Sequence, residues 1–105
     1  KIIVNLCINY GSKNEIVRSI NKSIKDGKAN FINEKKITNN LYFGLPEPDI
    51  LIRTGGMKRL SNFMLWQLAY TELFFLDKLW PDFKDKDLKK IINKFGKIKR
   101  NFGSI

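Results

Sequence analysis

Short apolar runs alternate with amphipathic segments along this chain, and this alternation is what most limits the fold it can adopt. Ile2–Ile8 is a mostly apolar run with several β-branched residues, and Asp49–Arg53 is a second run that is apolar except at its ends. Runs of this kind are typical of strands buried on both faces, as in parallel sheets. Because helical patterns separate the runs, the sequence predicts an α/β fold with a mainly parallel sheet flanked by helices.

Spacing and capping residues predict the remaining elements. A capping box formed by Ser12 and Glu15 marks the start of the first helix. The expected helices run from Ser12 to Asp26–Gly27, over Asn33–Leu41, from the N-cap Ser61 to about Tyr70, and from about Asp85 onward. The inward faces are expected at Ile16, Val17, Ile20 and Ile24, at Ile37 and Leu41, and at Leu88, Ile91, Ile92, Phe95 and Ile98. A third strand is expected at Glu72–Leu76, a turn at Thr54–Gly56 and a rigid corner at Trp80–Phe83.

The first residues of the chain indicate whether the sequence represents a whole domain or a part of one. Lys1 precedes the first apolar run directly, with no initiator Met and no lead-in loop. Three strands with apolar faces on both sides make a thin sheet that needs further neighbours. We therefore expect residues 1–105 to be the C-terminal part of a single domain whose N-terminal half is absent.

Composition removes several classes of function. No apolar stretch approaches the roughly 20 residues that span a bilayer. The chain has no His, which excludes His-based acid–base chemistry and His metal ligands within it. Cys7 is the single cysteine and lies in an apolar run, so we interpret it as a buried thiol in a reducing compartment.

The net charge of +10 raises the question of an anionic partner. Lys, Ile and Asn supply 41 of the 105 residues, a bias typical of AT-rich coding sequences, so we interpret most lysines as solvating helix faces. The basic segment from Lys89 to Arg100 is interpreted in the same way, with attraction to anionic lipid headgroups as the weaker alternative. A nucleic-acid-binding module is a further class of function, but no nucleic-acid motif accompanies the lysines, and we predict no nucleic-acid partner.

One segment carries most of the chemical information. Ligands of open parallel sheets bind beyond the carboxyl ends of strands, and two such ends are marked here, at Asn9–Ser12 and at Arg53–Gly56. At the second end, glycines permit close approach of the backbone, Arg53 and Arg59 can each bind phosphate oxygens bidentately, and a helix starting at Ser61 would attract an anion. The chain has only four arginines among its many lysines, so a close arginine pair indicates that guanidinium geometry matters. The segment therefore predicts a phosphate or diphosphate site.

A purely structural interpretation of the same residues stays open. Arg53 and Arg59 could instead pair with Asp49 or Glu72, and Ser61 could be only a helix cap. Glu72 itself lies between apolar segments and is expected to be partly buried, which a carboxylate tolerates when it is paired or binds a metal. The sequence thus offers two roles for Glu72, as a ligand of Mg²⁺ or as the partner of an arginine.

Several motifs together resemble a known family. The C-terminal signature of cis-prenyltransferases of the bacterial undecaprenyl diphosphate synthase type is similar to Pro48–Gly56, Arg59–Gln67, Tyr70, Glu72–Leu73 and Leu79–Phe83. The turn at Asn9–Gly11 and the helix start that follows it also resemble that family. The resemblance covers nearly the whole chain, and the run from the arginine and glycines to Leu60, Ser61, Asn62 and Phe63 is highly specific.

The resemblance implies a function and a site. Arg53, Arg59 and Ser61, with the backbone at Leu60, would hold the diphosphate of isopentenyl diphosphate, and Glu72 would help to bind Mg²⁺. The family condenses isopentenyl diphosphate onto an allylic diphosphate such as farnesyl diphosphate, which gives a long-chain cis-polyprenyl diphosphate, the precursor of the cell-wall lipid carrier. A cytoplasmic homodimer, with peripheral contact at the inner membrane face as a further expectation, is implied as well.

Departures from the family pattern are also informative. Met57 stands where these enzymes often have Glu, and Asn101 replaces the second Arg of an Arg-Arg-Phe-Gly ending. The family's Asp-Gly-Asn motif, which carries the catalytic metal-binding Asp, is not in this chain, so we expect no catalytic residue here and no turnover by the chain alone. The alternative function is a non-catalytic partner subunit of the same fold.

Overall fold

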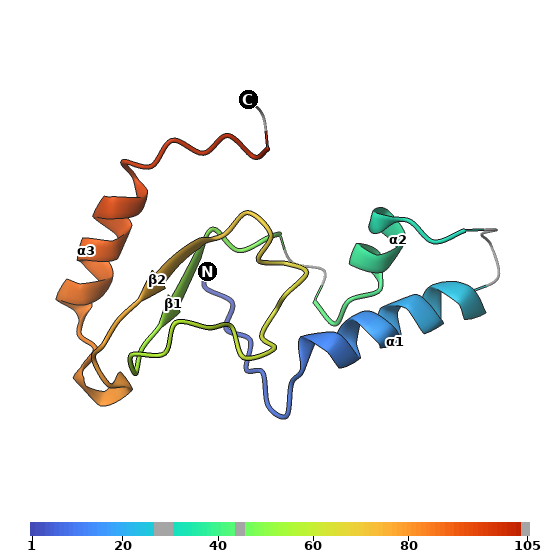
Figure 1. The fold of residues 1–105 in the computed structure, drawn as a ribbon, viewed down its shortest axis with the longest axis horizontal. Coiled ribbons are helices and arrows are strands. Elements are labelled where there is room, and N and C mark those ends of the chain that lie inside the picture. Colours follow the sequence, from blue (N-terminus) through green and yellow to red (C-terminus); the bar gives the residue numbers. More distant parts are fainter. Residues whose placement is uncertain (27–30, 44–45, 104–105) are drawn as a thin grey trace. The chain divides into compact units, whose positions relative to one another are not determined.

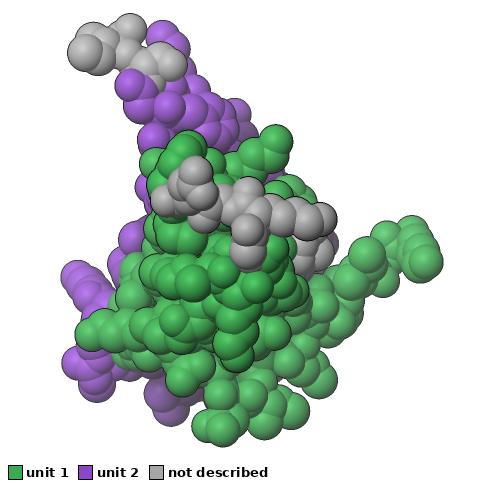
Figure 2. Space-filling model, turned by 90° about the vertical axis from the view of Figure 1, so that its right-hand side faces the viewer, with its two compact units in different colours: residues 1–46, 60–66 green, residues 47–59, 67–105 purple. Residues whose placement is uncertain are grey.

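Residues 1–26, 31–43 and 46–103 are described by a computed structural model, shown as a ribbon in Figure 1. The chain divides into two units, which Figure 2 shows in different colours. The helical unit comprises Lys1–Pro46 and Leu60–Trp66, and the sheet unit comprises Glu47–Arg59 and Gln67–Ile105. The segment with the predicted phosphate-binding residues therefore contributes Arg53 and Arg59 to the sheet unit and Leu60 and Ser61 to the helical unit.

The sheet unit is built on two parallel strands, β1 (Ile50–Arg53) and β2 (Glu72–Phe75), which lie side by side in Figure 1. Their register pairs Ile50 with Glu72 and Arg53 with Phe75. Both strands lie within one residue of their predicted positions, and the parallel pairing confirms the predicted α/β class. Apolar β-branched and aromatic side chains favour strands, and every residue of β1 is half-buried.

After β2 the chain makes one turn of 3-10 helix at Trp80–Asp82, which is the predicted corner, and continues into α3 (Asp85–Phe95). Ile91 is buried on α3 and Phe95 is half-buried, as the helical spacing predicts. Leu88 and Ile92 are exposed, and the helix ends before Ile98. The predicted inward face of this helix is therefore only partly covered within the sheet unit.

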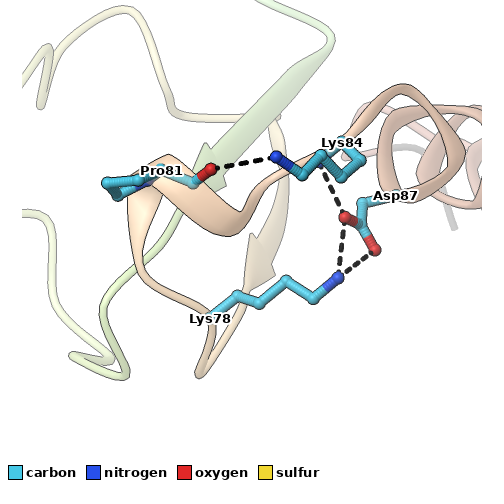
Figure 3. A network of polar contacts seen from close by, with 4 residues as sticks. All are labelled: Lys78, Pro81, Lys84 and Asp87. Carbon is cyan, nitrogen blue, oxygen red and sulfur yellow. Dashed lines mark hydrogen bonds and ion pairs between the residues drawn. The ribbon is translucent and has the colours of Figure 1, made fainter.

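Charged residues fix the start of α3, as Figure 3 shows. The Asp87 carboxylate accepts hydrogen bonds from Lys78 Nζ at 2.8 Å and from the backbone N–H of Lys84 at 2.9 Å, while Lys84 Nζ donates to the carbonyl oxygen of Pro81. The hydrogen bond from Lys78, and then that from the Lys84 backbone, lower the pKa of Asp87 below its usual value. An acidic residue near a helix N-terminus also interacts favourably with the helix dipole.

The helical unit contains α1 (Ser12–Lys25) and α2 (Glu34–Asn39), both close to their predicted positions. The N-cap of α2 is Asn33, whose side chain accepts a hydrogen bond from Lys36 N, and Ile37 and Leu41 are buried as predicted. The first helix ends at Lys25 with Asp26 as its C-cap, whereas Gly27 lies outside the described residues.

The buried face of α1 differs from the prediction. Val17 and Ile24 are exposed, Ile16 and Ile20 are only half-buried, and the residues buried in this helix are polar: Ser12, Glu15, Ser19 and Ser23. Small serines allow α2 to approach closely, and Ser19 Oγ donates a hydrogen bond to the carbonyl oxygen of Ile37 at 2.6 Å. Satisfying such a buried carbonyl favours this packing over the burial of Val17 and Ile24.

The predicted first strand is wrong for this structure. Residues 1–7 have no regular secondary structure, and Ile2, Val4 and Ile8 are 76–90% exposed. A strand forms only with a hydrogen-bonded neighbour, and in the described part of the chain β1 and β2 pair with each other alone. Cys7 is exposed with this segment, which corrects its interpretation as a buried thiol.

The helix predicted from Ser61 to about Tyr70 is also wrong, because this stretch is a series of turns. Three of its residues have left-handed backbone conformations, with φ of 49° at Ser61, 61° at Asn62 and 46° at Met64. Residues with positive φ interrupt a right-handed helix.

A helix that spans a bilayer needs about 20 mostly apolar residues. Within the described ranges, no helix meets this requirement of length and hydrophobicity.

Candidate functional site

The two arginines of the predicted phosphate site meet in the sheet unit. Arg53 is the last residue of β1 and is half-buried, and its Nη1 donates a hydrogen bond to the backbone carbonyl oxygen of Arg59. The Arg59 side chain is exposed. A guanidinium carries five N–H donors in a planar arrangement, so one arginine can donate to several oxygens. The contact closes the loop between the two residues and brings the backbone of Arg59 to the Arg53 side chain, at the carboxyl end of β1.

The glycine turn inside this loop is fastened to the chain that follows β2. Gly55 and Gly56 have φ of 89° and 77°, conformations that glycine adopts at little cost. The N–H of Gly55 donates to the carbonyl oxygen of Lys78 at 2.7 Å, and the N–H of Gly56 donates to that of Leu76 at 2.9 Å. These donors are therefore engaged within the protein, and the glycines shape the loop instead of binding a phosphate through their N–H groups.

Ser61 does not act as the predicted helix N-cap. It is exposed, and it begins the series of turns in the helical unit. The N–H of Phe63 donates to the carbonyl oxygen of Leu60 at 3.1 Å, which closes the first of these turns. We predicted that the dipole of a helix starting at Ser61 would attract an anion. Because this stretch forms turns, Ser61 offers its hydroxyl and backbone without a helix dipole.

Asn62 has a role that the sequence did not indicate, since it caps α1 from a distance. Its carbonyl oxygen accepts from Ser12 N at 2.8 Å, and its Oδ1 accepts from Lys13 N at 2.9 Å. Both are N–H groups of the first turn, which have no partner within the helix itself. Gly11, and not Ser12, is the N-cap residue, and the predicted capping box of Ser12 and Glu15 does not form. Ser12 Oγ instead accepts from Leu65 N at 2.9 Å.

Glu15 is the centre of a polar cluster next to Asn9–Ser12, the first of the two segments that the sequence marked as a candidate binding region. Its carboxylate is fully buried and accepts hydrogen bonds from the Tyr10 hydroxyl and, at 2.8 Å, from the backbone N–H of Tyr42. Burial, and then the hydrogen bond to Glu15, raise the pKa of Tyr10 to about 12. Tyr10 and Tyr42 also line a hollow of about 770 Å³ together with residues 6–9, Gly11, Asn14 and Phe43.

Glu72 is half-buried, as predicted, but it lies away from the arginine pair. It pairs with Ile50 at the start of the strands, whereas Arg53 pairs with Phe75 at their end. Three residues of strand correspond to about 10 Å, so Glu72 and Arg53 lie at opposite ends of the sheet. Asp49, one of the carboxylates that the structural interpretation offered to the arginines, forms an ion pair with Arg100 instead.

The donor set around Glu72 limits what this chain offers to a metal. Within residues 1–26, 31–43 and 46–103 there is no group of three or more Asp, Glu, Cys or His side chains that could hold an ion. Glu72 makes no ion pair within these ranges, and a carboxylate oxygen is a ligand that Mg²⁺ prefers. Glu72 thus offers one oxygen ligand of the kind that Mg²⁺ takes, and a magnesium site here would need further ligands from outside this set.

Comparison with known proteins decides the family. Residues 1–103 match the family described as "Putative undecaprenyl diphosphate synthase". The chain belongs to this prenyltransferase family. The resemblance found in the sequence motifs is thereby confirmed, and the fold class agrees with that of the solved prenyltransferases.

Individual isoprenyl transferases are similar to the chain over nearly all of its length. It is 49% identical to an isoprenyl transferase of Fusobacterium nucleatum over 105 residues, and 51% identical to one of Helicobacter pylori over 106 residues. These alignments cover 100% and 95% of this chain but 45% of each relative. The chain thus spans less than half the length of the curated relatives it matches.

Two solved structures share the fold. A probable undecaprenyl diphosphate synthase from Campylobacter jejuni has a TM-score of 0.84 and 38% identity, over 92% of this chain and 45% of that one. Lavandulyl diphosphate synthase from Lavandula x intermedia, in complex with dimethylallyl diphosphate, has a TM-score of 0.83 and 36% identity, over 92% of this chain and 44% of that one. Both proteins are named as diphosphate synthases.

Proposed function

We propose that this chain is the C-terminal part of a cis-prenyltransferase domain. The full-length enzyme would condense isopentenyl diphosphate with an allylic diphosphate such as farnesyl diphosphate, which yields a long-chain cis-polyprenyl diphosphate for cell-wall glycan assembly. The observation that carries the proposal is the arginine pair: Arg53 ends a parallel strand and is hydrogen-bonded to Arg59, in a chain that belongs to the prenyltransferase family.

In this proposal the chain supplies the site for isopentenyl diphosphate. Arg53 and Arg59 would bind the diphosphate oxygens through charge-assisted hydrogen bonds, which are stronger than neutral ones. Ser61 would donate its exposed hydroxyl, and the backbone at Leu60 would complete the set. Their function is to hold the diphosphate in one orientation and to balance its charge, which is catalysis by positioning and electrostatics.

We propose Glu72 as one ligand of Mg²⁺ in the full-length enzyme. When bound, the metal would balance charge on the diphosphates and orient them for reaction. Within this chain, the contribution of Glu72 is a half-buried carboxylate at the start of β2 that makes no ion pair in the described residues. The remaining ligands would come from parts of the enzyme outside this chain.

The proposal extends to assembly and location. Exposed apolar side chains on α3, at Leu88 and Ile92, together with the exposed Leu79 and Trp80, are consistent with a homodimer that buries them. The enzyme would work in the cytoplasm, with peripheral contact at the inner membrane face through basic side chains such as Lys89 and Lys90.

A non-catalytic partner subunit of the same fold is the second candidate. One observation favours it: Asn101 stands where the family has an arginine. Such a subunit would complete the site of another chain without reacting itself. The sequence that precedes Lys1 in the full-length protein distinguishes the two, because an Asp-Gly-Asn motif there supports the enzyme.

The test is incorporation of labelled isopentenyl diphosphate by the full-length protein, with farnesyl diphosphate as acceptor and with either Mg²⁺ or a chelator. We expect Mg²⁺-dependent incorporation into a product that is extracted into organic solvent and resolved by chain length. A full-length protein that gives no product under these conditions, while a known cis-prenyltransferase does, would contradict the enzyme proposal and favour the partner-subunit alternative.

A further inference from the structure

Arg100 joins the C-terminal tail, residues 99–103, to the segments that precede β1 and β2 through two separate contacts. Its Nη1 forms an ion pair with the Asp49 carboxylate, and its Nη2 donates a hydrogen bond to the carbonyl oxygen of Tyr70 at 2.9 Å. Asp49 precedes β1 by one residue, and Tyr70 precedes β2 by two. Arg100 therefore bridges the beginnings of both strands, next to Glu72, whose backbone N–H donates to the carbonyl oxygen of Asp49 at 3.1 Å.

Aromatic rings of the sheet unit lie against the Arg100 side chain. The guanidinium carbon of Arg100 lies 4.4 Å from the ring centroid of Phe102 and 5.4 Å from that of Phe95. The Phe102 ring in turn lies 6.0 Å from that of Tyr70. The Arg100 side chain is 17% exposed and the Asp49 side chain is 68% exposed, so the ion pair is shielded from solvent on the arginine side.

Closing the tail in this way completes a polar hollow around Glu72. The hollow has a volume of about 260 Å³, and its lining combines Glu72 and its neighbours in the chain with tail residues. From the tail, residues 99–102 line the hollow, and from the segment that leads into β2, residues 69–72 line it. Because Lys99 and Asn101 flank Arg100, their place in the lining depends on Arg100 holding the tail.

We infer that Arg100 is a positioning residue that holds the C-terminal tail against the starts of β1 and β2 and so fixes the surroundings of Glu72. The inference rests on the proposed role of Glu72 as a magnesium ligand. An arginine suits this task, because its planar guanidinium can hydrogen-bond to two groups at once while its faces contact aromatic rings. Residues that orient a metal ligand typically change metal affinity or activity about 10- to 100-fold when they are removed.

The experiment compares Arg100→Ala and Arg100→Lys with the wild type in the full-length protein, using two independent readouts. Amide hydrogen exchange over residues 99–103 reports on the tail without requiring activity. The Mg²⁺ concentration for half-maximal incorporation of isopentenyl diphosphate reports on Glu72. We expect Arg100→Ala to accelerate exchange in the tail and to raise the required Mg²⁺ concentration by about tenfold. Arg100→Lys keeps the charge but makes one contact, so it should rescue both readouts only in part.

Two further variants separate this role from a general effect of charge. Lys97→Gln removes a positive charge from an exposed position just before the tail and should match the wild type in both readouts. Asp49→Asn weakens the ion pair from the opposite side, and its effects should not add to those of Arg100→Ala, because both variants disrupt one contact.

Each outcome bears on the inference. Unchanged exchange in the tail of Arg100→Ala would overturn it, and so would faster exchange with an unchanged requirement for Mg²⁺. If Arg100→Ala does not fold, the same comparison is made with Arg100→Lys. If the wild type itself has no prenyltransferase activity, the proposed function fails, and wild-type exchange in the tail of Arg100→Ala or Arg100→Lys would still overturn the tail contact by itself.

Discussion

The side chain of Arg53 donates a hydrogen bond to the backbone carbonyl oxygen of Arg59, six residues further along the chain. The contact spans a loop whose two glycines have left-handed conformations and whose N–H groups are engaged by the segment after β2. The loop is therefore held at both ends before any ligand arrives. A site that is preorganised in this way loses less conformational entropy when it binds a diphosphate.

The loop conformation makes a prediction about Gly55. An added Cβ would meet no atom within 4 Å, so the cost of Gly55→Ala comes from its φ of 89° alone. We expect the variant to lower the free energy of unfolding by about 1–2 kcal/mol, measured by chemical denaturation of the full-length protein. Gly96→Ala is the matched control, because Gly96 has a right-handed φ of −60° and should be neutral or slightly stabilising when replaced. Equal effects of the two substitutions would contradict the description of the loop.

Asn62 makes a second prediction, because it caps α1 from the turns that follow Ser61. Asn62→Ala removes the acceptor of Lys13 N and places alanine at a φ of 61°. We expect a loss of about 1–2 kcal/mol in the free energy of unfolding, and a lower melting temperature. Asn62→Asp keeps the acceptor and adds a negative charge at the helix N-terminus, so it should retain most of the stability. Equal losses in both variants would show that the cap is not the cause.

Tyr10 predicts a dependence of stability on alkaline pH. Its pKa is raised from 10.0 to about 12 in the folded state, so the folded protein holds this proton more tightly than the unfolded chain. The resulting stabilisation is fully present below pH 10 and is lost as the pH rises through 12. The measurement is the free energy of unfolding of the wild type and of Tyr10→Phe across this interval. The wild type should lose stability more steeply than the variant, and parallel curves would contradict the shifted pKa.

Much of the sheet unit could be predicted from local patterns. The apolar run before Arg53 and the run that starts at Glu72 identified β1 and β2 within one residue, and the helical spacing of apolar residues after Asp85 identified α3. These elements were predictable because propensity, spacing and capping agree over short stretches. The pairing of Arg53 with Arg59 was not predicted, although both residues were assigned to one site.

The errors have a common physical origin, since each depends on partners far away in the sequence. The apolar pattern of Ile2–Ile8 predicts a strand, but a strand needs a neighbour to pair with, and these residues have none in the described sheet. The cap of α1 comes from Asn62, about 50 residues away, and Ser12 and Glu15 make other contacts instead. Arg100 and Asp49 are 51 residues apart, and no local pattern connects them.

The left-handed residues explain the remaining error. Nothing in the sequence from Ser61 to Tyr70 excludes a helix, and its apolar residues fall at helical spacing. Positive φ at Ser61 and Met64 is set by the contacts of the folded unit, and such tertiary effects override helix propensity. The segment from Ser61 therefore presents irregular turns where a helix N-terminus was expected.

The central claim is that the loop of Arg53 and Arg59 binds the diphosphate of isopentenyl diphosphate. Its most direct test is to measure kcat and KM of the full-length enzyme for each substrate, in the wild type and in Arg53→Ala. Losing one bidentate charged contact should cost about 2–4 kcal/mol, or roughly tens- to several-hundred-fold in kcat/KM for isopentenyl diphosphate. The KM for farnesyl diphosphate should change little, and Lys58→Ala should serve as a control that removes an exposed charge from the same loop. If Arg53→Ala and Lys58→Ala both retain wild-type kinetics with isopentenyl diphosphate, this loop is not the diphosphate site.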